Sequence, residues 1–162
     1  MMNDEDPIDN VESADSGPAE HAVSDQDQAA QENPLVEPEN RLAEISLEDL
    51  PERLQQAAAK AGWSSLLAVQ AKAIPYLQAR RDLMIQSQTG SGKTGAYLLP
   101  ILDRIDPEKA VCQALVLVPT RELAHQVARE AEILGSVMGV RSIAVYGGVS
   151  YGPRLEAFQQ GV

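Results

Sequence analysis

The segment from Ser87 to Thr94 reads Ser-Gln-Thr-Gly-Ser-Gly-Lys-Thr and has the residue types of a phosphate-binding loop. Glycines 90 and 92 would let the backbone turn its N–H groups toward an anion, and a helix that follows the loop would add the positive end of its dipole. Lys93 would then reach the terminal phosphates of a nucleotide, and the Thr94 hydroxyl would bind Mg²⁺. We therefore predict a nucleotide site with Lys93 and Thr94 in the catalytic roles.

The residues around this loop would place it between a strand and a helix. Residues 82–86 are a short apolar run of strand length, and residues 95–99 are compatible with a helix. The stretch 90–94 keeps the end of the G-x-x-x-x-G-K-[ST] pattern, although Ser87 stands where the pattern has its first glycine. A glycine- and serine-rich turn that contains a lysine by chance is the alternative, and it would not require these flanking elements.

Charge is distributed unevenly along the 162 residues. Residues 1–40 contain twelve Asp or Glu and no Lys or Arg, so the net charge of −11 belongs to this segment. The acidic balance therefore does not exclude a nucleic-acid ligand for the rest of the chain. We interpret residues 1–44 as a disordered acidic arm, because their apolar residues are too few to offset the entropy of ordering. Such an arm is either a solubilising extension or an interaction tail that mimics nucleic acid, and its partner is unknown.

The single cysteine, Cys112, excludes an intrachain disulfide, and we expect it to be buried at the start of an apolar run. No apolar stretch reaches the roughly 18 residues that span a membrane, and the acidic N-terminus lacks a signal-peptide pattern. We therefore expect a cytoplasmic protein without a membrane partner.

The chain after residue 44 alternates helical and strand patterns. The apolar runs 114–118 and 142–146 have the composition of strands buried in a parallel sheet. Strands that alternate with helices predict right-handed βαβ units, so we expect an α/β domain whose sheet, with three strands, is incomplete. Helices are expected at 51–61, 68–77, 95–99, 122–134 and 154–160.

Local signals mark the ends of these helices. Ser46 or Asp49 would cap the first helix, and Thr120 would cap the fourth. Pro75 would bend or end the second helix, since it has no N–H to donate. In the last helix we expect Leu155 and Phe158 to face inward.

Three further stretches accompany the phosphate loop. Gly62 to Gln70, followed by Ala-Ile-Pro at 73–75, precedes it, whereas Pro-Thr-Arg-Glu-Leu-Ala at 119–124 and the pair Gly147-Gly148 follow it. In this order and spacing they closely resemble the first half of the N-terminal RecA-like domain of DEAD-box ATP-dependent RNA helicases.

This resemblance implies that residues 45–162 are a partial N-terminal RecA-like, P-loop NTPase domain, with 45–73 as its adenine-recognition region, the Q motif. Gln70 would pair its amide with the N6 and N7 edge of adenine and so select ATP, although outside this context it would be a surface glutamine. ATP and Mg²⁺ are the implied cofactors, and Thr94 is the implied metal ligand. The implied ATP-binding residues are Gln70, Ser87, Gln88, Thr89, Gly90, Ser91, Gly92, Lys93 and Thr94.

The resemblance also assigns one set of residues to the RNA sugar-phosphate backbone: Pro119, Thr120, Arg121, Gly147 and Gly148. Backbone N–H groups at a helix start and one guanidinium can bind a phosphate, and such contacts hold RNA without reading its sequence. Taken alone, Arg121 would be a surface ion pair, and we expect His125 to be structural or solvated.

The sequence departs from the family pattern in two respects. Ile45 stands where an aromatic residue usually stacks on adenine, and residues 66–69 read Leu-Leu-Ala-Val instead of Pro-Thr-Pro-Ile. Loss of the ring would weaken base binding by about 1–3 kcal/mol. The Asp-Glu-Ala-Asp and Ser-Ala-Thr motifs, and a second RecA-like domain with its arginine finger, do not occur in these residues. We therefore expect weak ATP binding without hydrolysis.

We interpret the chain as an N-terminal fragment of a DEAD-box RNA helicase, which in full length would couple ATP hydrolysis to the opening of RNA duplexes. A naturally short, non-catalytic nucleotide- or RNA-binding regulatory protein is one alternative. A small-molecule or nucleotide kinase is another, although it would have no use for Gln70 or for residues 119–124.

Overall fold

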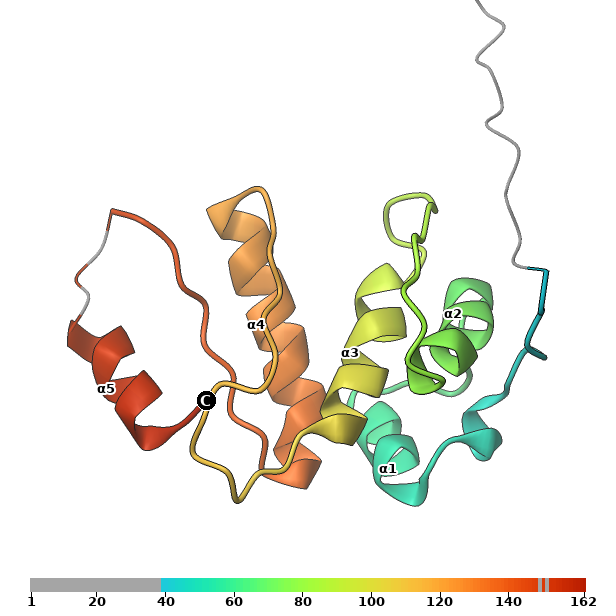
Figure 1. Ribbon diagram of the computed structural model, residues 1–162, viewed down its shortest axis with the longest axis horizontal. Helices are drawn as coiled ribbons and strands as arrows, with labels where there is room; N and C mark the ends of the chain where they lie inside the picture. Colours follow the sequence, from blue (N-terminus) through green and yellow to red (C-terminus); the bar gives the residue numbers. More distant parts are fainter. Residues whose placement is uncertain (1–38, 149, 151) are drawn as a thin grey trace, which may run out of the picture. The chain divides into compact units, whose positions relative to one another are not determined.

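The computed structural model describes residues 39–148, 150 and 152–162 (Figure 1). Helices form at all five predicted places, and none of those in the described part of the chain has the length and hydropathy of a membrane span. Most of the predicted acidic arm lies outside the described residues. The helices are α1 (Glu52–Lys60), α2 (Ala68–Gln78), α3 (Lys93–Arg104), α4 (Arg121–Gly135) and α5 (Gly152–Gln160), with the 3₁₀ turns η1 (Leu47–Asp49) and η2 (Ser136–Met138).

The hydrophobic core lies between α1, α2, α3 and α4. Helix α3 packs against both α2 and α4, and α1 packs against α4 and η2. Leu54, Ile74, Leu99 and Leu134 are fully buried, each contributing about 1.5–3 kcal/mol to folding. Helix α1 buries one face, with Leu54, Ala57 and Ala58 in the interior. The core side chains are Leu50, Leu54, Ala57, Ile74, Leu98, Leu99, Leu102, Ala131 and Leu134.

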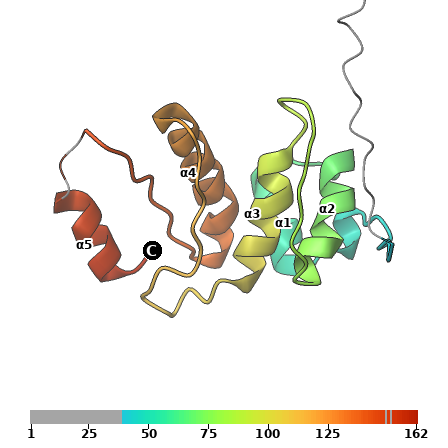
Figure 2. The same cartoon turned by 45° about the horizontal axis from the view of Figure 1, so that its top comes forward.

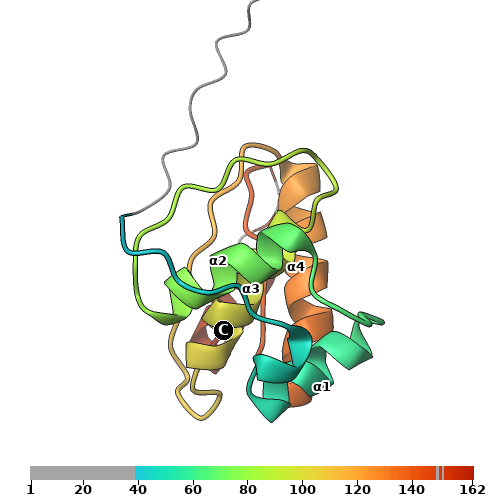
Figure 3. The same ribbon diagram turned by 90° about the vertical axis from the view of Figure 1, so that its right-hand side faces the viewer.

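Helix α2 continues past Pro75 to Gln78. Of the two outcomes expected from the sequence, that Pro75 would bend the helix or end it, the second is wrong. A proline cannot donate to the carbonyl four residues earlier, which here belongs to Ala71. The backbone N–H of Ile45 donates to this carbonyl at an N–O distance of 3.2 Å, and the segment before η1 runs past α2 (Figure 3). Leu42 N–H donates to the Tyr76 hydroxyl at 3.0 Å. The proline therefore leaves an acceptor that helps to fix residues 42–45 on α2.

The helix caps are partly as predicted. The Thr120 hydroxyl accepts the N–H of the third residue of α4 at 3.2 Å, so this cap is confirmed. Ser46 does not cap α1, because its N–H and hydroxyl both donate to the Asp49 carboxylate, at 2.8 and 2.9 Å, and close η1 instead. Leu50 is extended, as expected for a residue before a proline, so Pro51 separates η1 from α1.

The three segments predicted as strands are not strands among the described residues. Residues 82–86, 114–118 and 142–146 run without regular secondary structure, and no backbone hydrogen bond joins them in this part of the chain (Figures 1 and 2). Leu115 and Leu117 are 78% and 84% exposed. A strand requires backbone partners beside it, and these segments have none here, so the parallel sheet stays a prediction.

A cavity of about 560 Å³ lies where the segments 114–118 and 142–146 run beside α3 and α4. Cys112, Leu155 and Phe158, which we expected to be buried, are all exposed. These expectations were wrong because they assumed a complete sheet for the side chains to pack against. Without the paired strands, the apolar side chains around the cavity remain partly in solvent.

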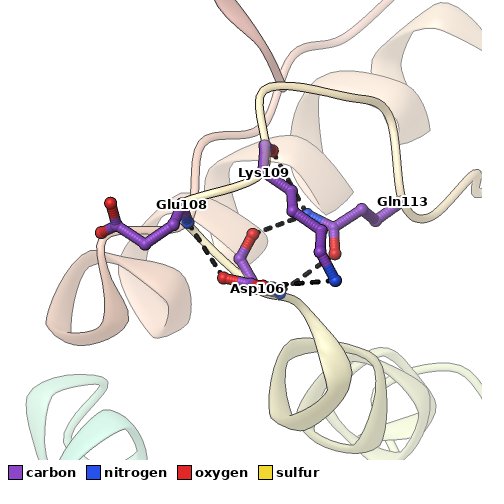
Figure 4. A network of polar contacts seen from close by, with 4 residues as sticks. All are labelled: Asp106, Glu108, Lys109 and Gln113. Carbon is purple, nitrogen blue, oxygen red and sulfur yellow. Dashed lines mark hydrogen bonds and ion pairs between the residues drawn. The ribbon is translucent and has the colours of Figure 1, made fainter.

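The connection from α3 to the segment 114–118 is held by a network around Asp106 (Figure 4). Gln113 accepts the Asp106 N–H at 3.0 Å and donates its amide to the Asp106 carbonyl at 2.7 Å. The Asp106 carboxylate accepts the Glu108 N–H at 3.1 Å and pairs with Lys109 at 3.3 Å. The turn therefore has a defined conformation although the segment after it is unpaired.

The unpaired segments predict a pattern of amide hydrogen exchange. Amides 115–118 should exchange much faster than those in the middle of α4, because exchange of a hydrogen-bonded helical amide requires local unfolding. Exchange followed by mass spectrometry with peptide resolution measures the difference. Protection of 115–118 equal to that of α4 would show that these residues are paired in solution.

Candidate functional site

The loop 87–92 connects an extended segment to the first residue of α3. Gly90 and Gly92 have φ angles of 81° and 91°, a left-handed conformation that favours glycine. Gln88, Thr89 and Gly90 are exposed. The backbone therefore turns where the sequence requires it to turn, and the rim of the loop is accessible to a ligand.

Lys93 bends back into the loop. Its Nζ donates to the carbonyl oxygens of Ser87 at 2.5 Å and Gln88 at 2.6 Å, and lies 3.5 Å from the Ser91 hydroxyl. The ammonium is thus held on the inner side of the loop, in the first turn of α3. Thr94 follows it in the same turn.

Gln70 connects α2 to this loop. Its side chain is 2% exposed, and its Oε1 accepts the Leu67 N–H at 2.9 Å. Its Nε2 donates to the Gly92 carbonyl at 3.2 Å. A glutamine amide has two donors and two acceptor positions, so one N–H and one lone pair remain for a ligand.

Two glycines allow α2 to approach the loop and α3 this closely. A Cβ at Gly92 would lie 2.6 Å from Leu67 Cδ1 and 2.9 Å from Gln70 Nε2. A Cβ at Gly95 would lie 2.7 Å from Gln70 Nε2 and would overlap the Trp63 ring. Trp63 is a site residue that the sequence reasoning missed. Its position at the start of the stretch that ends in Gln70 was the available signal.

Tyr97 of α3 and Glu130 of α4 lie partly buried near Thr94. Burial raises the pKa of Tyr97, a side-chain hydrogen bond with Thr94 opposes this rise, and the charge of Glu130 adds to it. Burial also raises the pKa of the Glu130 carboxyl. Tyr97 therefore stays neutral at physiological pH and can hold the Thr94 side chain through a hydrogen bond.

The residues assigned to RNA lie at the start of α4 and in the turn before α5. Pro119, Thr120 and Arg121 are exposed, and Arg121 Nε lies 3.6 Å from the Glu122 carboxylate. An exposed ion pair of this kind contributes little to stability. Arg121 can therefore exchange the Glu122 carboxylate for another anion. The pair Gly147-Gly148 is also exposed.

Tyr146 lies between these two segments, and the sequence reasoning did not single it out. Its ring centroid is 4.5 Å from Arg154 Cζ and 5.8 Å from Arg121 Cζ. The ring of His125 packs against it at a centroid distance of 4.7 Å with an interplanar angle of 56°. His125 is exposed, and its ring is in contact with that of Tyr146.

The family model of the DEAD/DEAH box helicases matches residues 67–162, which is more than half of the chain. This chain belongs to the DEAD/DEAH box helicase family. The match includes Gln70, the phosphate loop and both segments assigned to RNA. The kinase alternative is therefore wrong.

Individual curated RNA helicases are similar to this chain. RNA helicase CrhR of Synechocystis sp. is 43% identical over 113 residues, which cover 70% of this chain and 23% of CrhR. ATP-dependent RNA helicase DeaD of Escherichia coli K12 is 46% identical, over 62% of this chain and 16% of DeaD. The chain thus spans less than a quarter of the length of these curated relatives.

The solved structure of an RNA helicase also matches the fold of the chain. The crystal structure of the RNA helicase Prp28 from Chaetomium thermophilum bound to ADP aligns with a TM-score of 0.65 and 34% identity. The alignment covers 75% of this chain and 31% of Prp28. The chain therefore has the fold of part of a DEAD-box helicase.

The predicted site residues of this DEAD-box chain fall into two groups. Gln70 and the loop 87–94 form one group, and the segments 119–121 and 147–148, with Tyr146 between them, form the other. No hydrogen bond or ion pair joins the groups among the described residues. Helices α3 and α4 begin at the same end of the packed pair (Figures 1 and 2).

The close approach at Gly95 predicts the effect of one substitution. Gly95→Ala should lower the free energy of unfolding by about 1–3 kcal/mol, because its methyl group must displace Trp63 and Gln70. Alanine otherwise favours a helix by about 1 kcal/mol over glycine. Urea unfolding followed by circular dichroism measures the change.

Gly152→Ala is the matched control, since a Cβ there would meet only the Ser150 hydroxyl, at 3.8 Å. This variant should be as stable as the unsubstituted protein or slightly more stable. Equal effects at positions 95 and 152 would contradict the close packing of α2 on α3.

Proposed function

We propose that this chain is the ATP-binding and RNA-backbone-binding part of an ATP-dependent RNA helicase. The observation that carries the proposal is the hydrogen bond from Gln70 to the Gly92 carbonyl, which joins a group able to read a base to a loop able to bind phosphates. The names of CrhR and DeaD and the ADP in the Prp28 structure support the same function.

Each residue of the ATP site has a distinct role in this proposal. The free N–H and lone pair of Gln70 face the N7 and N6 groups of adenine, while the loop amides and Lys93 neutralise the phosphates. Thr94 offers its hydroxyl to Mg²⁺, which would further neutralise the phosphate charge. The described residues contain no cluster of three or more His, Cys, Asp or Glu, so the cation would depend on Thr94 and on the phosphates.

The RNA part of the proposal uses the start of α4 and the glycine turn. The N–H groups of the first turn of α4 and the guanidinium of Arg121 can bind backbone phosphates, and the exposed pair Gly147-Gly148 allows a sugar-phosphate chain to approach closely. Such contacts depend on charge and shape, so they would bind single-stranded RNA of any sequence.

The proposal extends to the domain that these sites belong to. Residues 45–162 would be part of an N-terminal RecA-like domain. In a chain as long as its relatives, the segments 82–86, 114–118 and 142–146 would pair as parallel strands of this domain. A second RecA-like domain would supply the arginine finger. The exposed apolar side chains of the segment 114–118 support its assignment as a strand, because Leu115 and Leu117 are suited to a buried sheet.

ATP binding tests the roles of Lys93 and Gln70. Lys93→Ala should weaken binding of a fluorescent ATP analogue with Mg²⁺ by about tenfold or more, since a charge-assisted contact to phosphate is lost. Gln70→Ala should reduce the preference for ATP over GTP by a similar factor, because a paired donor and acceptor discriminate by about 1–3 kcal/mol. Lys60→Ala and Gln56→Ala, both at exposed positions of α1, are the controls and should bind normally. An unchanged affinity for Lys93→Ala would overturn the ATP site.

Hydrolysis should be absent from the 162-residue chain. Its sequence holds the groups that bind phosphates but no Asp-Glu-Ala-Asp motif to position the attacking water. A malachite-green assay should therefore detect no phosphate release above background, with or without RNA. Release that RNA stimulates and that Lys93→Ala abolishes would show that other residues position the water.

A further inference from the structure

Tyr146 lies between the two segments assigned to RNA, and the proposed function gives it no role. We propose that Tyr146, held in place by Arg154, is a positioning residue that joins the segments 119–121 and 147–148 into one binding surface for the phosphodiester backbone of RNA. This inference rests on the proposed function, because it concerns how the RNA-binding segments are held.

Arg154 spans the glycine turn. Its Nε donates to the Ala144 carbonyl at 3.3 Å, and its Nη1 donates to the Ser150 carbonyl at 2.9 Å. These two carbonyls lie on either side of the pair Gly147-Gly148. Because the guanidinium is planar and rigid, it fixes the separation of its two acceptors and so restricts a turn that two glycines would otherwise leave flexible.

The same guanidinium stacks on Tyr146. Its Cζ lies 4.5 Å from the ring centroid, within the range of a cation–π interaction, and Arg154 is half-buried. The segment that carries Tyr146 is also tied to α4, since the Ser142 hydroxyl donates to the Ala128 carbonyl at 3.2 Å. The ring therefore has a fixed position relative to α4 and α5.

This fixed ring meets the first turns of α4. Arg121 lies 5.8 Å from its centroid and His125 packs on it at 4.7 Å. An exposed arginine loses side-chain entropy when it binds a phosphate, and a contact that already restricts the guanidinium reduces that cost. Tyr146 would thus strengthen the phosphate contact of Arg121 without touching RNA itself.

The surface has the chemistry of a site for a polyanion. It combines two guanidiniums, the N-terminal N–H groups of α4 and a turn without side chains. The guanidiniums and N–H groups can donate hydrogen bonds to backbone phosphates, and the glycine turn leaves room for the chain; none of them distinguishes one base from another. The ligand class is therefore single-stranded RNA recognised through its backbone.

A double-mutant cycle tests the positioning role. Binding of a fluorescein-labelled oligouridylate is measured by anisotropy over a range of salt concentrations for Arg121→Ala, Tyr146→Leu and the double variant. Each single substitution should weaken binding about three- to tenfold and lower the salt slope by about 0.7, the loss of one phosphate contact. The RNA affinity of the double variant should lie within a factor of about two of that of Arg121→Ala, because Tyr146 acts through Arg121.

Conservative variants separate positioning from packing. Tyr146→Phe keeps the ring and should keep full RNA affinity, whereas Arg154→Lys keeps the charge but loses the planar fork and should bind as weakly as Tyr146→Leu. Arg129→Ala, at an exposed position of α4, controls for the loss of a positive charge and should have little effect. All variants should bind the ATP analogue normally, which shows that they fold.

Two results would overturn the inference. Losses that add in the double variant would mean that Tyr146 acts independently of Arg121, and a Tyr146→Phe variant as weak as Tyr146→Leu would mean that the ring is not what matters. Both leave the proposed RNA contact of Arg121 in place. An Arg121→Ala variant that binds RNA as well as the unsubstituted protein would instead refute that contact, and the inference with it.

Discussion

The close approach of α2 to the phosphate loop is the constraint on which the rest of the structure depends. Gln70 holds the Gly92 carbonyl, and only the lack of a side chain at Gly92 and Gly95 leaves room for Gln70 and Trp63. Through this contact α2 is packed along α3, and α3 supplies three leucines of the core. The residues that could bind a nucleotide are therefore also residues that hold the fold together, and a substitution at either glycine affects both.

The sequence was sufficient for the helices because their signals act within a turn or two. The period of apolar residues and the hydroxyl of Thr120 involve neighbours in the chain, and both gave the right elements. The way in which α2 continues past Pro75 to Gln78 could not be predicted, for the opposite reason. Pro75 leaves the Ala71 carbonyl unpaired within the helix, and its partner, the N–H of Ile45, comes from a segment far away in the sequence.

The strands could not be settled from the sequence because pairing is not a local property. The run 114–118 shows that its side chains suit a buried sheet, but it carries no information on whether another strand lies beside it. The exposure of Leu117 and of Phe158 has the same origin, since both were judged from patterns that assume neighbours. The backbone turn of the loop 87–94 was predictable because its signals lie in eight consecutive residues, whereas the environment of Tyr146 comes from three separate parts of the chain.

The arrangement of α3 and α4 would place the proposed ATP and RNA sites close together. Each helix follows an extended segment, and both begin at the same end of the pair, so their positive dipole ends face the same way (Figures 1 and 2). Lys93 and Arg121 each add a cation at one of these ends. Between the helices, partial burial raises the pKa of both Tyr97 and Glu130. Because α3 packs against α4, the roles proposed for Lys93 and Arg121 would both depend on how this one pair of helices is packed.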